Sequence, residues 1–83
     1  MQNQEVFDIV RDLVADLCGV PSEQITGSTD LFSLGLDSIL VVHLVALLHN
    51  RFGLKVQIKD FFITPCIDSV VEMIEARQQR DLV

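Results

Sequence analysis

The sequence predicts an all-α fold: a small four-helix bundle with three long helices, one short helix before the last, and a long ordered loop between the first two. In each long segment, apolar residues recur at spacings of three and four, as they do on one buried face of a helix. Only residues 54–58 alternate apolar and polar side chains as a strand would, and no partner strand accompanies them. The 83 residues fit a single domain, residues 1–83.

The first long helix is predicted over residues 5–18. Charged residues occupy the side opposite its apolar residues, so the segment is amphipathic. Gly19 and Pro21 stop the helix, because glycine favours the turn after a helix end and proline cannot continue the helix. The side that we expect to be buried consists of Val6, Ile9, Val10, Leu13, Val14 and Leu17.

Residues 19–37 form a connection rich in Gly, Ser, Thr and Asp. Connections of this length are uncommon in compact domains unless they are functional. We expect an ordered loop with a short turn of helix over residues 21–24, because the segment contains apolar residues that can anchor it to the core. These anchors are Ile25, Leu31, Phe32, Leu34 and Leu36.

The second long helix is predicted over residues 38–52. Asp37 can cap it by accepting hydrogen bonds from N–H groups of the first turn, and Gly53 ends it. At about 100° per residue the helix has two sides. The side assigned to the core contains Leu40, Val41, Leu44, Val45, Leu47, Leu48 and Phe52. The other side contains Ser38, Ile39, Val42, His43, Ala46, His49 and Asn50.

The rest of the chain is predicted to contain an extended segment over residues 54–58, a short helix over 59–63 and a last helix over 67–79. Thr64 and Pro65 separate the two helices, because the residue before a proline avoids the helical conformation. The side chains that we expect to enter the core from these segments are Leu54, Val56, Ile58, Val70, Val71 and Ile74.

Composition argues against several classes of function. The net charge is −6 and the six Lys and Arg are scattered, so we expect no nucleic-acid binding. No apolar stretch is long enough for a membrane span, and the N-terminus lacks the features of a signal peptide, so we expect a cytoplasmic protein. We also expect a monomer. Met1 suggests a free-standing protein rather than an excised domain.

Neither the cysteines nor the histidines predict a metal site. Cys18 and Cys66 are too few for a disulfide framework, and we expect both to be reduced and at least partly buried. His43 and His49 are not spaced with the cysteines in a known ligand pattern, so no metal is predicted.

Ser38 has three interpretations. It can simply help to start a helix. A catalytic nucleophile needs a nearby base, but GLDSI is not G-x-S-x-G and His49 lies about 16 Å away along the helix axis, so we predict no catalytic residue. The third interpretation is that Ser38 is covalently modified, because free N–H groups and the helix dipole stabilise a phosphate attached at the first turn of a helix.

Two motifs then carry a family resemblance. Residues 34–39, LGLDSI, resemble the LGxDS(L/I/V) motif of acyl and peptidyl carrier proteins. Residues 61–67, FFITPCI, are similar to the F-x-x-x-P-T-I pattern that precedes the last helix of peptidyl carriers. The resemblance covers nearly the whole chain, including its acidic character and its order of helices.

The resemblance implies that Ser38 receives 4′-phosphopantetheine from coenzyme A through a separate magnesium-dependent phosphopantetheinyl transferase. The thiol of that arm would hold an acyl or aminoacyl group as a thioester, and the protein itself would catalyse nothing. Asp37 would flank the attachment point and assist recognition by the transferase, and Gly35 would permit the tight turn that exposes Ser38. Further partners implied are a loading enzyme, either an adenylating enzyme or an acyltransferase, and downstream synthase or tailoring enzymes.

The second helix indicates which kind of carrier this is. Carriers of bacterial fatty-acid synthesis place acidic residues along this helix, whereas residues 38–52 contain none. Its exposed side instead offers an apolar strip, which we define as Ile39, Val42 and Ala46. This strip favours a carrier for polyketide or nonribosomal-peptide enzymes over one for fatty-acid synthesis. A different alternative is an unmodified helical adaptor that binds a partner through the same strip. The expected partner surface is Ile39, Val42, His43, Ala46 and Phe62.

Overall fold

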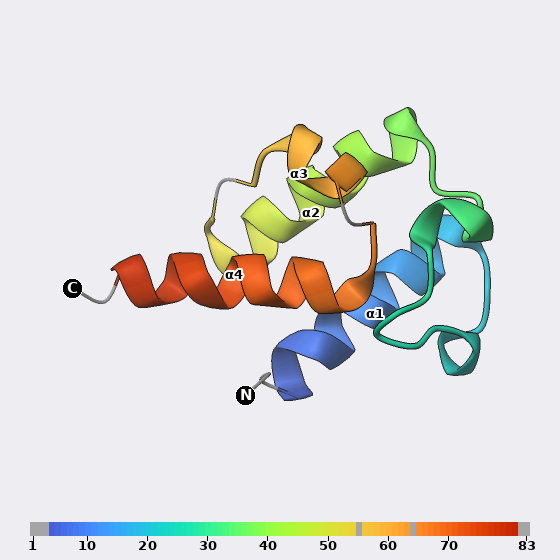
Figure 1. Cartoon of the computed structure of the whole chain (residues 1–83), viewed down its shortest axis with the longest axis horizontal. Coiled ribbons are helices and arrows are strands. Elements are labelled where there is room, and N and C mark those ends of the chain that lie inside the picture. Colours follow the sequence, from blue (N-terminus) through green and yellow to red (C-terminus); the bar gives the residue numbers. More distant parts are fainter. Residues whose placement is uncertain (1–3, 55, 64, 82–83) are drawn as a thin grey trace.

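The computed structural model describes residues 4–54, 56–63 and 65–81, and it describes their side chains except at 60–62 and 78–81. The long helices are α1 (Gln4–Cys18), α2 (Ser38–Phe52) and α4 (Ile67–Asp81), and α3 (Ile58–Ile63) is the short helix before the last (Figure 1). This element order confirms the predicted all-α fold with three long helices and one short one.

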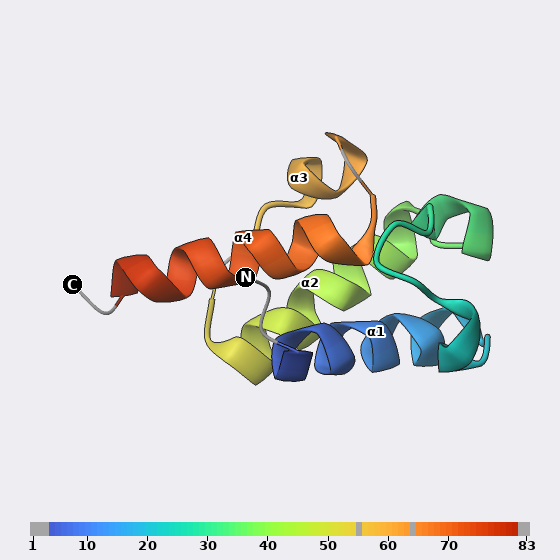
Figure 2. The same ribbon diagram turned by 60° about the horizontal axis from the view of Figure 1, so that its bottom comes forward.

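Helix α1 packs against both α2 and α4, and α3 packs against α2. Figure 2 shows α1 and α2 running beside each other below α4, with the long loop closing one end of the bundle. The three long helices share one core, because each turns an apolar face inward. The fully buried side chains at its centre are Val10, Val14, Leu31, Val41, Leu44, Leu48, Ile67, Val70, Val71 and Ile74.

The loop between α1 and α2 is ordered, as predicted. It contains two 3₁₀ turns, Ser22–Gln24 and Leu31–Leu34, of which only the first was expected. The second turn is started by Asp30, whose side chain accepts a hydrogen bond from the Phe32 N–H at 3.0 Å. Of the predicted anchors, Ile25, Leu31 and Leu36 are buried, and Phe32 and Leu34 are half-buried against the core.

Two backbone hydrogen bonds tie this loop to the region where α4 begins. The Leu31 N–H donates to the Pro65 carbonyl at 2.8 Å, and the Asp68 N–H donates to the Gly27 carbonyl at 3.0 Å. The loop is therefore fixed before its second 3₁₀ turn, at Gly27, and at the first residue of that turn, Leu31. These contacts and the anchors hold the residues that lead into α2.

Two residues that were predicted to lie in the core are exposed instead. Leu47 is 37% exposed, because it is rotated by about 100° from the fully buried Leu48 and lies at the margin of the inward face. Ile58 is 40% exposed, because it is the first residue of α3 rather than the end of an inserted extended segment. Leu54 and Val56 are buried as predicted. Ala15 is a buried core residue of α1 that the periodicity did not identify.

Candidate functional site

Ser38 is the first residue of α2, and it is exposed. Asp37 caps the helix as predicted: its Oδ1 accepts a hydrogen bond from the Leu40 N–H at 2.9 Å. The Asp37 carbonyl also accepts the first bond of the helix, from the Val41 N–H at 2.8 Å. An N-cap of this kind fixes where a helix begins. The serine hydroxyl is therefore held on the first turn at the surface.

The turn before Ser38 depends on Gly35. Its φ of 103° lies in the left-handed region, which glycine adopts without the steric cost of a side chain. The Gly35 N–H donates to the Phe32 carbonyl at 3.1 Å, and the Leu36 N–H donates to the Leu31 carbonyl at 3.3 Å. Leu36 is then buried, so the chain passes from a core anchor to the exposed cap within one residue.

The start of α2 offers free backbone donors. The first four N–H groups of a helix have no partner within the helix itself, unless a cap supplies one. Asp37 satisfies those of Leu40 and Val41, whereas the N–H groups of Ser38 and Ile39 make no hydrogen bond to any part of the chain that the structure describes. An anion attached to Ser38 would lie next to these donors and at the positive end of the helix dipole. The residues present thus suit a phosphate ester.

The cap gives a first prediction for stability. Asp37→Ala removes the acceptor for the Leu40 N–H, and we expect it to lower the free energy of unfolding by about 1 kcal/mol. Asp37→Asn should cost less, because asparagine also accepts this bond. Urea denaturation of the three proteins measures both differences. An equal loss in the two variants would show that the negative charge, rather than the hydrogen bond, stabilises this end of α2.

Cys18, at the end of α1, gives a prediction for reactivity. Burial raises the pKa of the Cys18 thiol, and the negative charge of Asp37 raises it further. A raised pKa lowers the fraction of reactive thiolate at a given pH. We therefore expect iodoacetamide at pH 7.5 to modify Cys18 more slowly in the folded chain than in urea. In the folded chain, the rate of modification should keep increasing as the pH is raised above the usual pKa of a thiol.

Peptide mapping separates Cys18 from Cys66, which is also half-buried and free. Asp37→Asn should increase the rate at which Cys18 of the folded chain is modified, because it removes the negative charge of Asp37, the smaller of the two causes of the raised pKa. Equal rates in the folded and unfolded chains would contradict the raised pKa.

The apolar strip lies on the exposed side of α2. Ile39 is 67% exposed and Val42 is 51% exposed, and Ala46 and His43 are exposed as well. The structure thus brings the four predicted partner-binding residues of α2 together on one surface. The backbone of Phe62 lies in α3, and its side chain is outside the described residues.

Helix α3 adds exposed apolar side chains that were not predicted. Ile63 is 76% exposed and Ile58 is 40% exposed. The sequence did hold a signal: four of the six residues of α3, Ile58, Phe61, Phe62 and Ile63, are apolar. A helix this short and this apolar cannot turn every such side chain toward one neighbour. Because α3 packs on α2, the exposed Ile58 and Ile63 belong to the helix next to the one that bears the strip.

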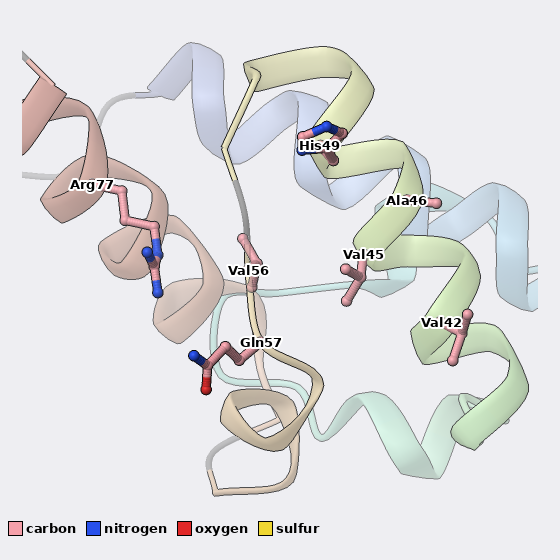
Figure 3. A pocket seen from close by; sticks show the side chains of 7 residues that line it. All are labelled: Val42, Val45, Ala46, His49, Val56, Gln57 and Arg77. Atoms are coloured by element: carbon pink, nitrogen blue, oxygen red, sulfur yellow. The ribbon is translucent and has the colours of Figure 1, made fainter.

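A groove opens beside the strip, with a cavity volume of about 650 Å³. One wall is formed by Val42, Val45, Ala46 and His49 of α2 (Figure 3). Val56 and Gln57, which precede α3, and Arg77 of α4 complete the lining. The His49 Nδ1 lies 3.4 Å from the Leu54 carbonyl oxygen. No pattern in the sequence predicted this groove.

Neither a metal centre nor a membrane span is found among the residues that the structure describes. Within them, no group of three or more His, Cys, Asp or Glu side chains is arranged to hold a metal ion. None of the helices traced in the structure is both long and apolar enough to cross a membrane.

Comparison with known proteins gives a consistent set of similarities. The sequence profile of the family described as "Phosphopantetheine attachment site" matches residues 8–74. The acyl carrier protein of Saccharopolyspora erythraea is 38% identical over 58 residues, which cover 69% of this chain and 61% of that protein. The nonribosomal peptide synthetase otaB of Aspergillus niger is 41% identical over 56 residues, which cover 68% of this chain and 3% of the synthetase.

The fold has a match among solved structures. The solution structure of an active-site mutant peptidyl carrier protein aligns with a TM-score of 0.82, covering 93% of this chain and 82% of that one at 18% identity. This similarity concerns the fold. The chain spans about three fifths of the first carrier protein and only a small part of the synthetase.

Proposed function

Because the chain belongs to the phosphopantetheine attachment site family, we propose that Ser38 carries the 4′-phosphopantetheine arm of a carrier protein. The observation that supports this assignment is the position of Ser38. It is an exposed serine on the first turn of α2, inside the matched residues, and it directly follows the capping Asp37. The free N–H groups of the first turn favour an anionic phosphodiester there.

Attachment requires only the hydroxyl of this chain. The Ser38 Oγ forms a new bond to the phosphorus of coenzyme A that bears the pantetheine, the bond to the adenosine bisphosphate part breaks, and the serine proton leaves to a base of the transferase. When bound, the group supplies a thiol that holds an acyl or aminoacyl chain as a thioester. The role of α2 is to hold Ser38 at the surface, where the transferase reaches it, while the chain itself remains non-catalytic.

The partners that we propose are enzymes of the polyketide or nonribosomal-peptide type. Support comes from the similarity to a nonribosomal peptide synthetase and from the surface of α2. That helix contains no acidic residue, and its exposed apolar strip would be buried against a partner. Apolar burial contributes about 25 cal/mol per Å² before the cost of association. A carrier for fatty-acid synthesis, by contrast, would use acidic residues on this helix.

Loading with an acyl group tests the carrier function. We expect acetyl-coenzyme A, Mg²⁺ and a broad-specificity phosphopantetheinyl transferase to add one acetyl-phosphopantetheine to the chain, as read from the intact mass. Hydroxylamine should then remove the acetyl group and leave the phosphopantetheine, because it cleaves a thioester and spares a phosphodiester. An adduct from which hydroxylamine removes nothing would contradict a thioester-bearing arm.

A further inference from the structure

We propose that the groove between α2 and α4 receives the acyl cargo, and that this cargo carries a free carboxylate that Arg77 binds. This inference rests on the proposed function and names the chemical class of the cargo. Three features support it: the reach of the arm, the polarity of the groove, and the absence of an ion pair on Arg77 among the described residues.

The reach of an arm on Ser38 matches the length of the groove. Along α2, Val42 lies about 6 Å from Ser38 and His49 about 16 Å from it, at 1.5 Å per residue. Three backbone bonds of an extended peptide span about 3.6 Å. At the same length per bond, an extended phosphopantetheine of roughly thirteen chain bonds reaches about 16 Å. A thiol on this arm can therefore enter the groove at any point from Val42 to His49. Its volume of about 650 Å³ suits a small-molecule ligand.

The α2 wall of the groove is apolar except for His49, and the opposite side is polar except for Val56. Val42, Val45 and Ala46 form the apolar wall. Figure 3 shows Arg77 and Gln57 across from that wall, with the ends of both side chains directed into the same region. The far end of a cargo that packs against the apolar wall would thus lie near the guanidinium of Arg77 and the side-chain amide of Gln57.

Arg77 is suited to an anion in this position. It is half-buried, and among the residues that the structure describes it makes no ion pair or hydrogen bond. Arg11 provides the contrast, because its guanidinium lies 3.6 Å from Asp8 and 3.3 Å from Asp12. Among the side chains that the structure describes, none that lines the groove is acidic. The fork of N–H groups on an arginine matches the two oxygens of a carboxylate, and such charge-assisted pairs are among the stronger hydrogen bonds.

The same charge argues against another class of cargo. A simple α-aminoacyl group has a free ammonium and no free carboxylate, so Arg77 would repel it. The groove therefore favours a short dicarboxylic acyl group, one of whose carboxyls forms the thioester while the other stays ionised.

A matched pair of cargoes tests this inference. We would load the ¹⁵N-labelled protein from glutaryl-coenzyme A or from valeryl-coenzyme A, which have equal chain length and differ in the terminal carboxylate. Intact mass records whether loading occurred. We expect the glutaryl form to shift the side-chain N–H signals of Arg77 and Gln57 well beyond the valeryl form. In the Arg77→Gln variant, glutaryl loading should shift the side-chain N–H signals of Gln57 no more than valeryl loading does.

Arg51→Gln is the matched control, because it removes the same charge from an exposed residue of α2 that does not line the groove. It should leave the glutaryl shifts unchanged. Loading followed by identical shifts for the two cargoes would overturn the carboxylate inference and leave the carrier function intact. A chain that accepts neither cargo, beside a control carrier that accepts both, would overturn the proposed function together with this inference.

Discussion

Ser38→Ala will not accept phosphopantetheine, while its fold will match that of the unmodified chain. The variant lacks the hydroxyl that forms the phosphodiester, so we expect complete loss of the mass increase. Its stability should change little, because Ser38 is exposed and the side chain that caps α2 belongs to Asp37. Intact mass after incubation with coenzyme A, Mg²⁺ and the transferase measures the modification, and circular dichroism compares the folds.

Ser28→Ala is the control for this loss. Ser28 is a serine of the same loop, and alanine there removes a hydroxyl without touching the first turn of α2. We expect it to accept one phosphopantetheine at the normal rate. If Ser38→Ala were still modified, the arm would be attached to another residue and the assignment would be wrong.

Val42→Glu and Ile39→Glu will slow recognition by a partner enzyme and leave the fold intact. Both side chains are more than half exposed, so the folded chain accommodates a charge at either position. A partner that buries the strip must desolvate the new carboxylate. The loss at a well-packed interface position is about 2 kcal/mol, or roughly 30-fold in rate. The measurement is kcat/KM for phosphopantetheinylation by the transferase, together with the melting temperature of each variant.

Asn50→Glu separates burial from charge in this experiment. Asn50 is an exposed residue on the same side of α2, about three turns from Ser38, and the substitution adds the same negative charge. We expect it to keep most of the activity. An equal loss in Asn50→Glu would mean that the transferase senses charge alone, and unfolding of Val42→Glu would mean that Val42 supports the core.

The fold could be predicted well from the sequence because the signals that define it are local. Helix periodicity identifies the inward faces of α1, α2 and α4, and Val10, Leu44 and Ile74 are all fully buried. Capping residues are equally local: Asp37 and Gly53 begin and end α2 where predicted. For the same reason, the residues around Ser38 are sufficient to place it on the first turn of a helix.

The features that could not be predicted from the sequence depend on how elements meet in space. The margin of a helix face is set by its neighbours, so periodicity alone put Leu47 on the wrong side. The groove joins residues from α2, from the segment before α3 and from α4. No spacing along the chain indicates that Arg77 faces Val42 and Ala46 across a cavity, because that juxtaposition depends on where α4 packs in the bundle.

Fragmentation mass spectrometry of the loaded chain locates the modification and so tests whether Ser38 carries the arm. Trypsin cleavage after Arg11 and Arg51 gives a peptide that contains the whole loop and α2 up to Arg51. We predict one phosphopantetheine per chain, at Ser38, with elimination leaving dehydroalanine at that position alone. A phosphopantetheine on another serine would contradict the assignment of Ser38. No modification of a folded chain, beside a modified control carrier in the same tube, would leave Ser38 as part of a helix start and favour an unmodified helical adaptor.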